Sequence, residues 1–199
     1  MGTIFKTAPR LGTALARAAL AASALLLAPL VARAADAPLR AAVFPFELYD
    51  TSLQGEMGGA GADEHARLAL IDGELRDLLA KSGRYEPIPL GSAAAKAEQS
   101  DLRTCDGCEV PLAREIGADV SVVGWVQKVS ELILNINLVI RDAKTGNVLH
   151  AGSVDIRGDT DESWSRGVSY LVRNRILAGP AGSGQGGQLQ GSQPPGSQH

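Results

Sequence analysis

The sequence predicts an α/β (α+β) fold, in which a single domain contains a five-stranded mixed sheet with helices packed on it. Two patterns indicate this class. Between residues 40 and 117, short apolar runs alternate with segments of helical periodicity, which is typical of strands covered by helices. Between residues 118 and 158, three strand-like runs follow one another with only short turns between them, which indicates an antiparallel three-strand meander. The expected order of elements is β-α-β-α-α-β-β-β-α.

The first half of the domain is expected to begin with a buried strand over residues 40–48, a compact apolar run that follows Pro38. Several glycines predict a loop over residues 49–62. A helix is expected over residues 63–81, because apolar residues recur there at helical spacing and Gly83 can end the run. The apolar positions of this helix are Leu68, Ile71, Leu75, Leu78 and Leu79.

Three short elements are predicted next. Residues 84–90 have the composition of a strand, and residues 92–99 that of a small helix capped by Ser92. A second short helix is expected to begin at Glu109 and to end at Gly117. Helices that follow strands in this way favour an open sheet with helical cover.

The second half of the domain predicts the meander and a closing helix. Strands are expected over residues 118–130, 131–142 and 148–158, with Gly146 in the turn between the last two. A final helix is expected over residues 159–177. In the second strand, every other residue is apolar: Leu132, Leu134, Ile136, Leu138 and Ile140.

The two ends of the chain have compositions unlike that of the domain. Residues 1–34 are typical of a cleaved secretory signal peptide, because basic residues without acids precede an apolar run and small residues stand before a cut after Ala34. A membrane anchor is the alternative, but the run is shorter than the roughly 20 residues that cross a bilayer. We therefore expect a periplasmic location, a globular domain over residues 35–177, and a disordered Gly/Ser/Gln/Pro tail over residues 178–199.

Charge and motifs exclude several functional classes. Removal of residues 1–34 leaves 15 basic and 22 acidic side chains, so the mature chain has a net charge of −7 and is a poor candidate for nucleic-acid binding. No membrane span is expected after signal removal. The sequence contains no G-x-S-x-G, H-E-x-x-H or glycine-rich phosphate loop. We therefore expect no enzymatic activity and no cofactor. The three histidines are scattered, so no metal site is expected either.

The two cysteines of the chain, Cys105 and Cys108, lie in the segment "RTCDGCE". In an exported chain, paired cysteines usually form a disulfide. A redox couple is the alternative, because the spacing is C-x-x-C and a helix is expected to begin just after Cys108. The residues before the motif are polar rather than strand-like, which argues against a thioredoxin arrangement. We expect a structural disulfide, and the redox interpretation stays open.

Two regions are candidate binding surfaces. The carboxylates of Glu47, Asp50 and Glu56 surround the first loop, where a cation site, an acid–base pair and a solvated loop edge are alternative interpretations. The polar face of the meander forms either a binding surface, an edge for strand addition, or an ordinary solvated face. The candidate residues are Tyr49, Asp50, Glu56, Gln127, Asn135 and Asn137.

Several segments resemble a known family. The stretches "AVFPFELYDTSLQGE", "CDGCEVPLAREIGAD" and "GWVQKVSELILNIN" are similar to an exported proteobacterial family classed as a domain of unknown function, catalogue number 3280 or 2380. The resemblance covers nearly all of residues 40–177 and implies no activity. The order of elements is also similar to the amino-terminal domain of TolB and to the curli secretion lipoproteins, which implies work through protein contacts in the envelope.

Together these observations predict a periplasmic binding or assembly-accessory protein without catalytic activity, whose partner is another envelope protein. Two alternatives remain. One is a periplasmic thiol-disulfide protein that uses Cys105 and Cys108, and the other is a domain that binds a small ligand.

Overall fold

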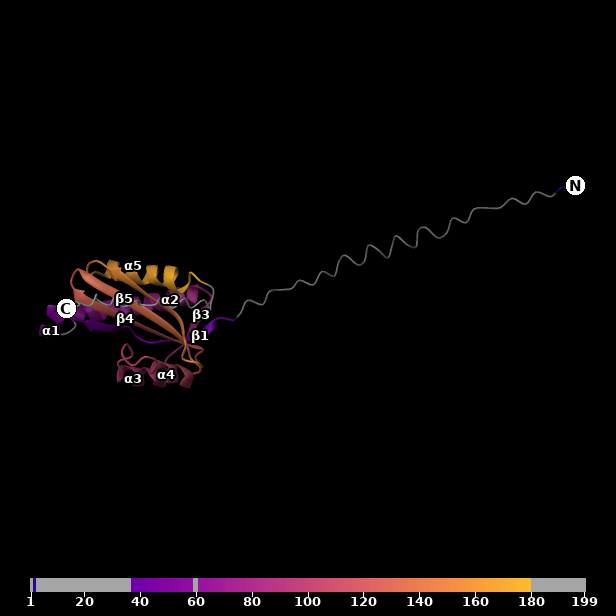
Figure 1. Ribbon diagram of the computed structural model, residues 1–199, viewed down its shortest axis with the longest axis horizontal. Helices are drawn as coiled ribbons and strands as arrows, with labels where there is room; N and C mark the ends of the chain where they lie inside the picture. Colours follow the sequence, from indigo (N-terminus) through magenta and orange to yellow (C-terminus); the bar gives the residue numbers. More distant parts are fainter. Residues whose placement is uncertain (1, 3–36, 59–60, 180–199) are drawn as a thin grey trace, which may run out of the picture. The chain divides into compact units, whose positions relative to one another are not determined.

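The computed structural model of the chain describes Gly2, residues 37–58 and residues 61–179 (Figure 1). The predicted signal peptide, its cleavage site and the predicted tail from residue 180 onward lie outside the described residues. From Ala37 onward, the described residues belong to one compact unit. None of the helices in this described part is both long and apolar enough to cross a membrane.

The described residues form six strands, five α-helices and a short π-helix. In order they are β1 (Leu39–Val43), β2 (Glu47–Asp50), α1 (Leu53–Gly58), α2 (Ala62–Lys81), β3 (Tyr85–Pro87), α3 (Ser92–Glu98), α4 (Glu109–Glu115), β4 (Val120–Ser130), β5 (Ile133–Asp142), β6 (Val148–Ile156), α5 (Asp161–Leu171) and η1 (Val172–Ile176). The α+β class is therefore confirmed.

The strands form one mixed sheet in the order β3-β1-β4-β5-β6, and β2 pairs with β4 on the same side as β1. The pairs among β1, β2, β3 and β4 are parallel. Strands β4, β5 and β6 form the expected antiparallel meander. Its last turn contains Gly146 with a φ of 77°, in the left-handed region that favours glycine.

The sheet contains six strands rather than the five that were predicted, because the expected strand over residues 40–48 is divided in two. Pro45 lies at the break and has no N–H group to donate to a neighbouring strand. The N–H of Phe46 donates instead to Asp72 Oδ1 of α2, at 2.9 Å. The two halves nevertheless pair with successive segments of β4, since β1 pairs with residues 120–122 and β2 with residues 125–128.

The expected loop over residues 49–62 was also partly wrong, because β2 extends to Asp50 and α1 follows it. Polar side chains begin this helix. The N–H of Ser52 donates to Asp50 Oδ1 at 2.8 Å, and Ser52 Oγ accepts from the N–H of Gly55 at 3.1 Å. This second bond is the usual contact of an N-terminal cap and offsets the low helix propensity of the glycines.

Ser92 does not cap α3 as predicted, since no side chain caps this helix and its N-cap residue is Gly91. The long helix α2 matches the prediction closely. Its predicted apolar positions are buried or packed against the core, and the chain leaves it at Gly83, whose φ is 67°.

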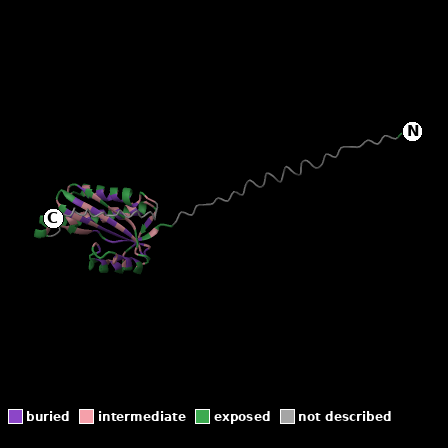
Figure 2. Cartoon of the chain, in the orientation of Figure 1, coloured by how far each residue is buried: buried purple, intermediate pink, exposed green. Residues whose placement is uncertain are grey.

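The first face of the sheet is covered by α2 and α5, which lie on the opposite side from α3 and α4 (Figure 1). Large apolar side chains fill this layer. Buried residues lie along the strands of the sheet and on the helices that cover it (Figure 2). The largest fully buried ones include Ile71, Leu75, Leu79, Leu134, Ile136, Leu138, Ile140, Trp164 and Leu171. The alternation predicted for β5 is thus confirmed for its four buried positions, whereas Leu132 lies in the turn and is 70% exposed.

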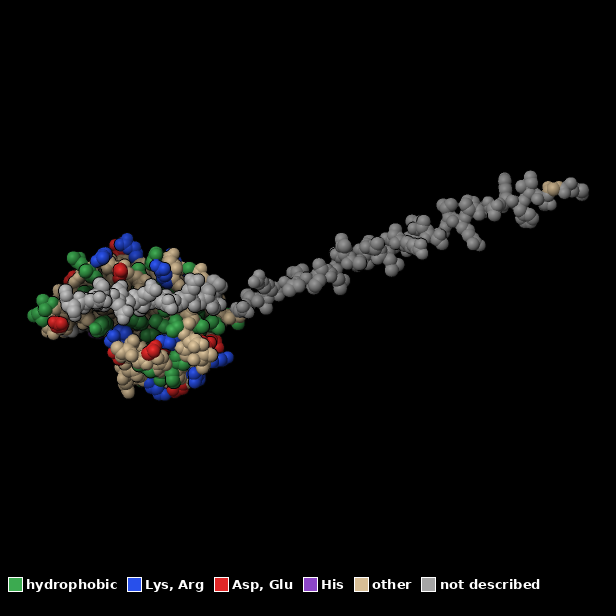
Figure 3. All heavy atoms as spheres, in the orientation of Figure 1, with side chains coloured by type: hydrophobic (Ala, Val, Ile, Leu, Met, Phe, Trp, Pro, Cys, Tyr) green, Lys and Arg blue, Asp and Glu red, His purple; other side chains and the backbone are tan. Residues whose placement is uncertain are grey.

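The second face is covered by α3 and α4 over only part of its area. The core there is thin, because alanines form most of it: Ala42, Ala93, Ala97, Ala113, Ala118 and Ala143. Hydrophobic side chains are also exposed at the end of the molecule that carries α1, where Leu53 and Met57 are 71% and 82% exposed (Figure 3). The partial cover leaves residues of β4, β5 and β6 accessible on the second face.

Candidate functional site

The register of the strands places one row of polar side chains across the uncovered part of the second face. Tyr49 of β2 pairs with Gln127 of β4. Gln127 in turn pairs with Asn135 of β5, and Asn135 pairs with Asp155 of β6. Paired residues point to the same face, so the four side chains form one row across four strands. Within it, Asn135 Nδ2 donates to Asp155 Oδ1 at 2.8 Å.

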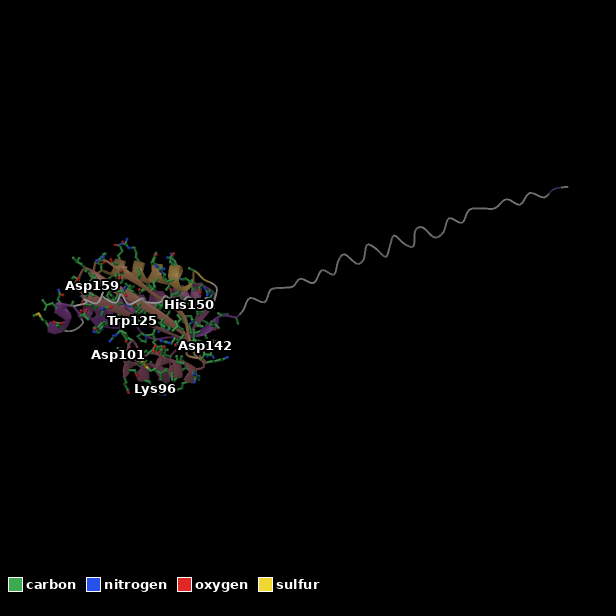
Figure 4. All side chains as sticks on the ribbon, viewed as in Figure 1. Lys96, Asp101, Trp125, Asp142, His150 and Asp159 are labelled. Atoms are coloured by element: carbon green, nitrogen blue, oxygen red, sulfur yellow. A yellow bond between two sulfur atoms is a disulfide. The ribbon has the colours of Figure 1, made fainter. Side chains whose placement is uncertain are left out.

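A second row lies beside the first. Trp125 pairs with Glu47 on one side and with Asn137 on the other, and Asn137 pairs with Ser153. Trp125 is half-buried and lies on the side of the sheet that faces α3 and α4 (Figure 4). We call the accessible part of both rows the open face. It comprises Tyr49, Trp125, Gln127, Asn135, Asn137, Ser153 and Asp155.

Four of the six candidate residues from the sequence therefore lie on the open face, and two do not. Asp50 pairs with Lys128, which places it on the opposite face of the sheet. Its carboxylate is engaged at the start of α1. Glu56 is exposed on α1. These two carboxylates and Glu47 do not converge on one site.

One border of the open face is formed by residues 101–108, which we call the disulfide loop. Cys105 and Cys108 are joined by a disulfide bond, with their Cα atoms 5.6 Å apart. Between them, Asp106 and Gly107 have φ values of 44° and 109°, so the chain turns sharply here. Cys105 is exposed, and Cys108 directly precedes α4.

Glu47 holds the disulfide loop to β2. Its two carboxylate oxygens accept the N–H groups of Leu102 and Arg103 at 2.7 and 3.0 Å. Burial raises the pKa of Glu47 above its usual value, although these two bonds oppose the shift. The interpretation of Glu47 as a solvated loop-edge carboxylate is therefore wrong. The Arg103 guanidinium, in turn, lies 4.1 Å from the ring centroid of Tyr49 and so connects the loop to the open face.

Arg141 of β5 holds the other end of the disulfide loop. Its guanidinium pairs with Asp106 within the loop and with Glu109 at 3.3 Å, and it donates to the carbonyl of Gly146. Glu109 is 3% exposed, and its second carboxylate oxygen has no hydrogen-bond partner among the described residues. Between the loop and the sheet lies a cavity of about 320 Å³, whose lining includes Trp125, Glu109 and Arg141.

A larger cavity of about 640 Å³, which we call the edge cavity, lies beside β2. Its lining includes residues 45–48, His65 and Leu68 of α2, and residues 97–103. Because α2 covers one face of the sheet and residues 97–103 lie over the other, the cavity is located at the edge of the sheet. Leu102 and Arg103 of the disulfide loop line both cavities.

The first face contains a cluster of charged side chains around Lys128, whose side chain is 1% exposed. Its Nζ lies 2.7 Å from carboxylate oxygens of Glu64, Glu131 and Asp159. Burial disfavours the charged amine, but the hydrogen bonds outweigh it and raise the pKa of Lys128. Arg67 adds a second cation, 3.1 Å from Asp159. The three carboxylates thus surround a lysine, and this cluster is an ion-pair network of the first face.

From residue 39 to residue 176, the sequence matches the family DUF3280, described as a protein of unknown function (DUF2380). The chain belongs to the DUF3280 family. The resemblance expected from the sequence is confirmed, and it covers the whole sheet and the open face. No curated protein matches the chain in sequence.

Solved structures of other proteins are similar to this DUF3280 chain in fold. The C-terminal domain of LpoB from Salmonella enterica is 17% identical, with 60% of this chain and 83% of that chain covered and a TM-score of 0.44. The lipoprotein GNA1162 from Neisseria meningitidis is 17% identical over 71% of this chain and 100% of that one, with a TM-score of 0.43. TolB from Acinetobacter baumannii is also similar, at 12% identity over 73% of this chain and 30% of TolB, with a TM-score of 0.39.

The sequence did not identify Trp125, Glu47 and Arg103 as residues of the open face or of its border. For Trp125, a pattern in the sequence could have identified it. The alternation that placed Asn135 and Asn137 on one face also places Trp125 beside Gln127 in β4. The roles of Glu47 and Arg103 have no such signal. They depend on contacts between residues more than 50 positions apart.

Proposed function

We propose that this DUF3280 chain is an exported, non-catalytic binding protein of the periplasm, and that its open face contacts another envelope protein. One observation carries the proposal: the register of three strands, β2, β4 and β5, gathers Tyr49, Gln127, Asn135 and Asn137 on an accessible part of the sheet. The signal-like composition of residues 1–34 supports the location.

The chemistry of the open face favours a polar protein surface as its partner. Asn and Gln side chains offer both donors and acceptors, which match peptide groups and neutral side chains of a partner. Tyr and Trp are enriched at protein interfaces because their rings bury a large area at low entropic cost. The two rows contain two carboxylates, those of Glu47 and Asp155. The carboxylate of Glu47 is occupied by the disulfide loop, so Asp155 alone can offer a negative charge to a partner. An uncharged, hydrogen-bonding partner surface therefore fits better than a strongly charged one.

The test is site-specific photo-crosslinking of the full chain in its native envelope. A benzophenone amino acid replaces Gln127 on the open face or, as a control, Arg166 on the outer side of α5, whose side chain is 74% exposed. We expect a discrete adduct with one partner from position 127 and none from position 166. Equal labelling from both positions, or no adduct from position 127, would contradict the proposal.

A paired variant sharpens this test. Asn137→Arg places a charge and extra bulk on the open face, and we expect at least about a tenfold loss of adduct, equivalent to roughly 1.4 kcal/mol. Tyr170→Arg on α5 is the matched control, because Tyr170 is 48% exposed and lies away from the open face. Unchanged cross-linking of Asn137→Arg would show that the open face is not the interface.

We further propose that the disulfide is structural. Support comes from the contacts that hold the loop on both sides, through Glu47 and Arg141. A loop held in one position in this way suits a disulfide that stabilises a turn rather than one that is repeatedly reduced and oxidised. The reduction potential of the Cys105–Cys108 pair distinguishes the two functions. A value below about −300 mV is expected for a structural bridge, whereas a value of about −120 to −200 mV would favour the thiol-disulfide alternative.

A further inference from the structure

The backbone of β2 has one edge that no strand of the described residues covers. In the pairing of β2 with β4, the N–H of Thr51 donates to the carbonyl of Lys128 at 2.8 Å. Alternate residues of a strand direct their backbone groups to opposite edges, so Glu47 and Tyr49 also face β4. Phe46, Leu48 and Asp50 face outward. The bond from the N–H of Phe46 to Asp72, on α2 rather than on β4, agrees with this assignment.

Leu48 is the central residue of this outward edge. Asp72 takes the N–H of Phe46, but no hydrogen bond among the described residues takes the N–H or the carbonyl of Leu48. Leu48 also lines the edge cavity. The unpaired N–H and carbonyl of Leu48 can therefore form hydrogen bonds with the backbone of a guest segment in the edge cavity.

The walls of the edge cavity specify the side chains of such a guest. Successive side chains of an added strand point to opposite faces of the sheet. One set would contact Leu68 and His65 of α2, and the other would contact Leu102 and the acidic residues beside it. The cavity lining contains the carboxylates of Glu47, Glu98 and Asp101 but only one guanidinium, that of Arg103. The first set is therefore expected to be apolar, and the second to include a basic residue.

We propose that the outer edge of β2 binds an extended segment of the partner protein by strand addition, with alternating apolar and basic side chains. The backbone of Leu48 supplies the central pair of hydrogen bonds, and the two walls of the edge cavity supply the specificity. This inference rests on the proposed function, because the segment belongs to the same envelope partner. Arg103, which lines the cavity and stacks on Tyr49, joins the two contact surfaces.

Photo-crosslinking from two positions tests the inference separately from the proposed function. The benzophenone probe is placed at Gln99, which lines the edge cavity, or at Gln127 on the open face. We expect adducts from both positions to the same partner. Peptide mapping of the Gln99 adduct should identify a segment with alternating apolar residues and a Lys or Arg.

The outcomes distinguish the two proposals. An adduct from Gln127 without one from Gln99 overturns strand addition and leaves the proposed function intact. No adduct from either position overturns both. A Gln99 adduct to another copy of this chain, or to residues 180–199 of the same chain, overturns the inference because the guest is then not a partner segment.

Two variants at Leu48 isolate the backbone hydrogen bond. Leu48→Pro removes the outward N–H and the side chain, whereas Leu48→Ala removes only most of the side chain. Proline is tolerated on an edge strand when its missing N–H faces away from the sheet. We expect the Gln99 adduct to fall at least about tenfold further in Leu48→Pro than in Leu48→Ala. Equal yields from the two variants would overturn the proposed backbone pairing.

Glu98→Lys provides a second test that does not depend on how well Leu48→Pro folds. Glu98 is exposed at the end of α3, so the substitution leaves the core unchanged. It reverses one charge of the cavity wall, and Glu98→Gln is the neutral control. We expect the Gln99 adduct to decrease from wild type to Glu98→Gln and further to Glu98→Lys. An increase in Glu98→Lys would overturn the assignment of a basic guest.

Discussion

The two faces of the sheet are covered in different ways. On the first face, α2 and α5 bury Trp164 and many leucine and isoleucine side chains. On the second face, α3 and α4 bury mainly alanines, and polar contacts hold them in place. Examples are the bonds of Glu47 to the disulfide loop and of Arg114 Nε to the carbonyl of Ala143 at 3.0 Å. The first face therefore supplies most of the stability, and the second combines thin cover with an accessible surface.

The largest difference is expected for the two tryptophans. Trp164→Ala should lower the free energy of unfolding by about 3–5 kcal/mol, because the ring is fully buried and its Nε1–H donates to Asp159 at 2.9 Å. Trp125→Ala on the second face should cost less than half as much, since Trp125 is half-buried. Equilibrium unfolding in urea measures both losses. A greater loss for Trp125→Ala would reverse the comparison.

The disulfide should have a smaller effect. The double variant Cys105→Ser/Cys108→Ser opens a loop with a sequence separation of 3, for which the loop-entropy relation gives a stabilisation of roughly 2 kcal/mol. We expect a loss of this size by urea unfolding, and the same loss when the wild-type chain is reduced. A loss well above about 3 kcal/mol would mean that the bridge holds more of the domain than its own loop.

Two glutamates should give pH effects of opposite sign, one for each face. On the first face, the hydrogen bond from Lys128 lowers the pKa of Glu64 below its usual 4.5. The stability that Glu64 contributes is therefore complete above pH 4.5 and is lost as the pH falls through the lowered pKa. The stability deficit of Glu64→Gln relative to wild type should thus shrink on acidification. Urea unfolding curves of both chains, measured above and below pH 4.5, test this prediction. A stability deficit of Glu64→Gln that does not change with pH would contradict it.

On the second face, burial raises the pKa of Glu47 above 4.5. The folded state then binds a proton more readily than the unfolded state, so wild type gains stability as the pH falls from 7 through the raised pKa. The Glu47→Gln variant lacks this gain. The free energy of unfolding of wild type should therefore increase relative to that of Glu47→Gln on acidification. The same direction of change for Glu47→Gln and Glu64→Gln would show that the two environments are alike.

The smallest effect on stability is expected on the open face. Asn135→Ala removes an exposed hydrogen bond to Asp155 and should change the free energy of unfolding by less than about 0.5 kcal/mol. The same variant should weaken cross-linking from Gln127. Thermal unfolding and adduct yield, measured on one preparation, separate the two effects. A large loss of stability would show that Asn135 stabilises the fold rather than contacting the partner.

The sequence was most informative where a pattern repeats along one segment. Helical spacing located α2, and alternation located β5 and its polar residues. Parallel pairing of β2 with β4 brings together Tyr49 and Gln127, which lie far apart in the sequence, and no local pattern encodes that register. The break at Pro45 and the start of α1 after Ser52 depend on side-chain contacts with the backbone, which outweigh the apolar run and the glycines.

The interruption at Pro45 also limits how many strands can add at the outer edge of β2. A long exposed strand edge can template the addition of one chain after another, which leads to aggregation. The outer edge of β2 is only four residues long, and Asp72 has already taken the N–H of Phe46 just before it. Helix α1 follows within three residues of its end. Such a short edge can accommodate a single guest segment but offers little length for the growth of a fibril.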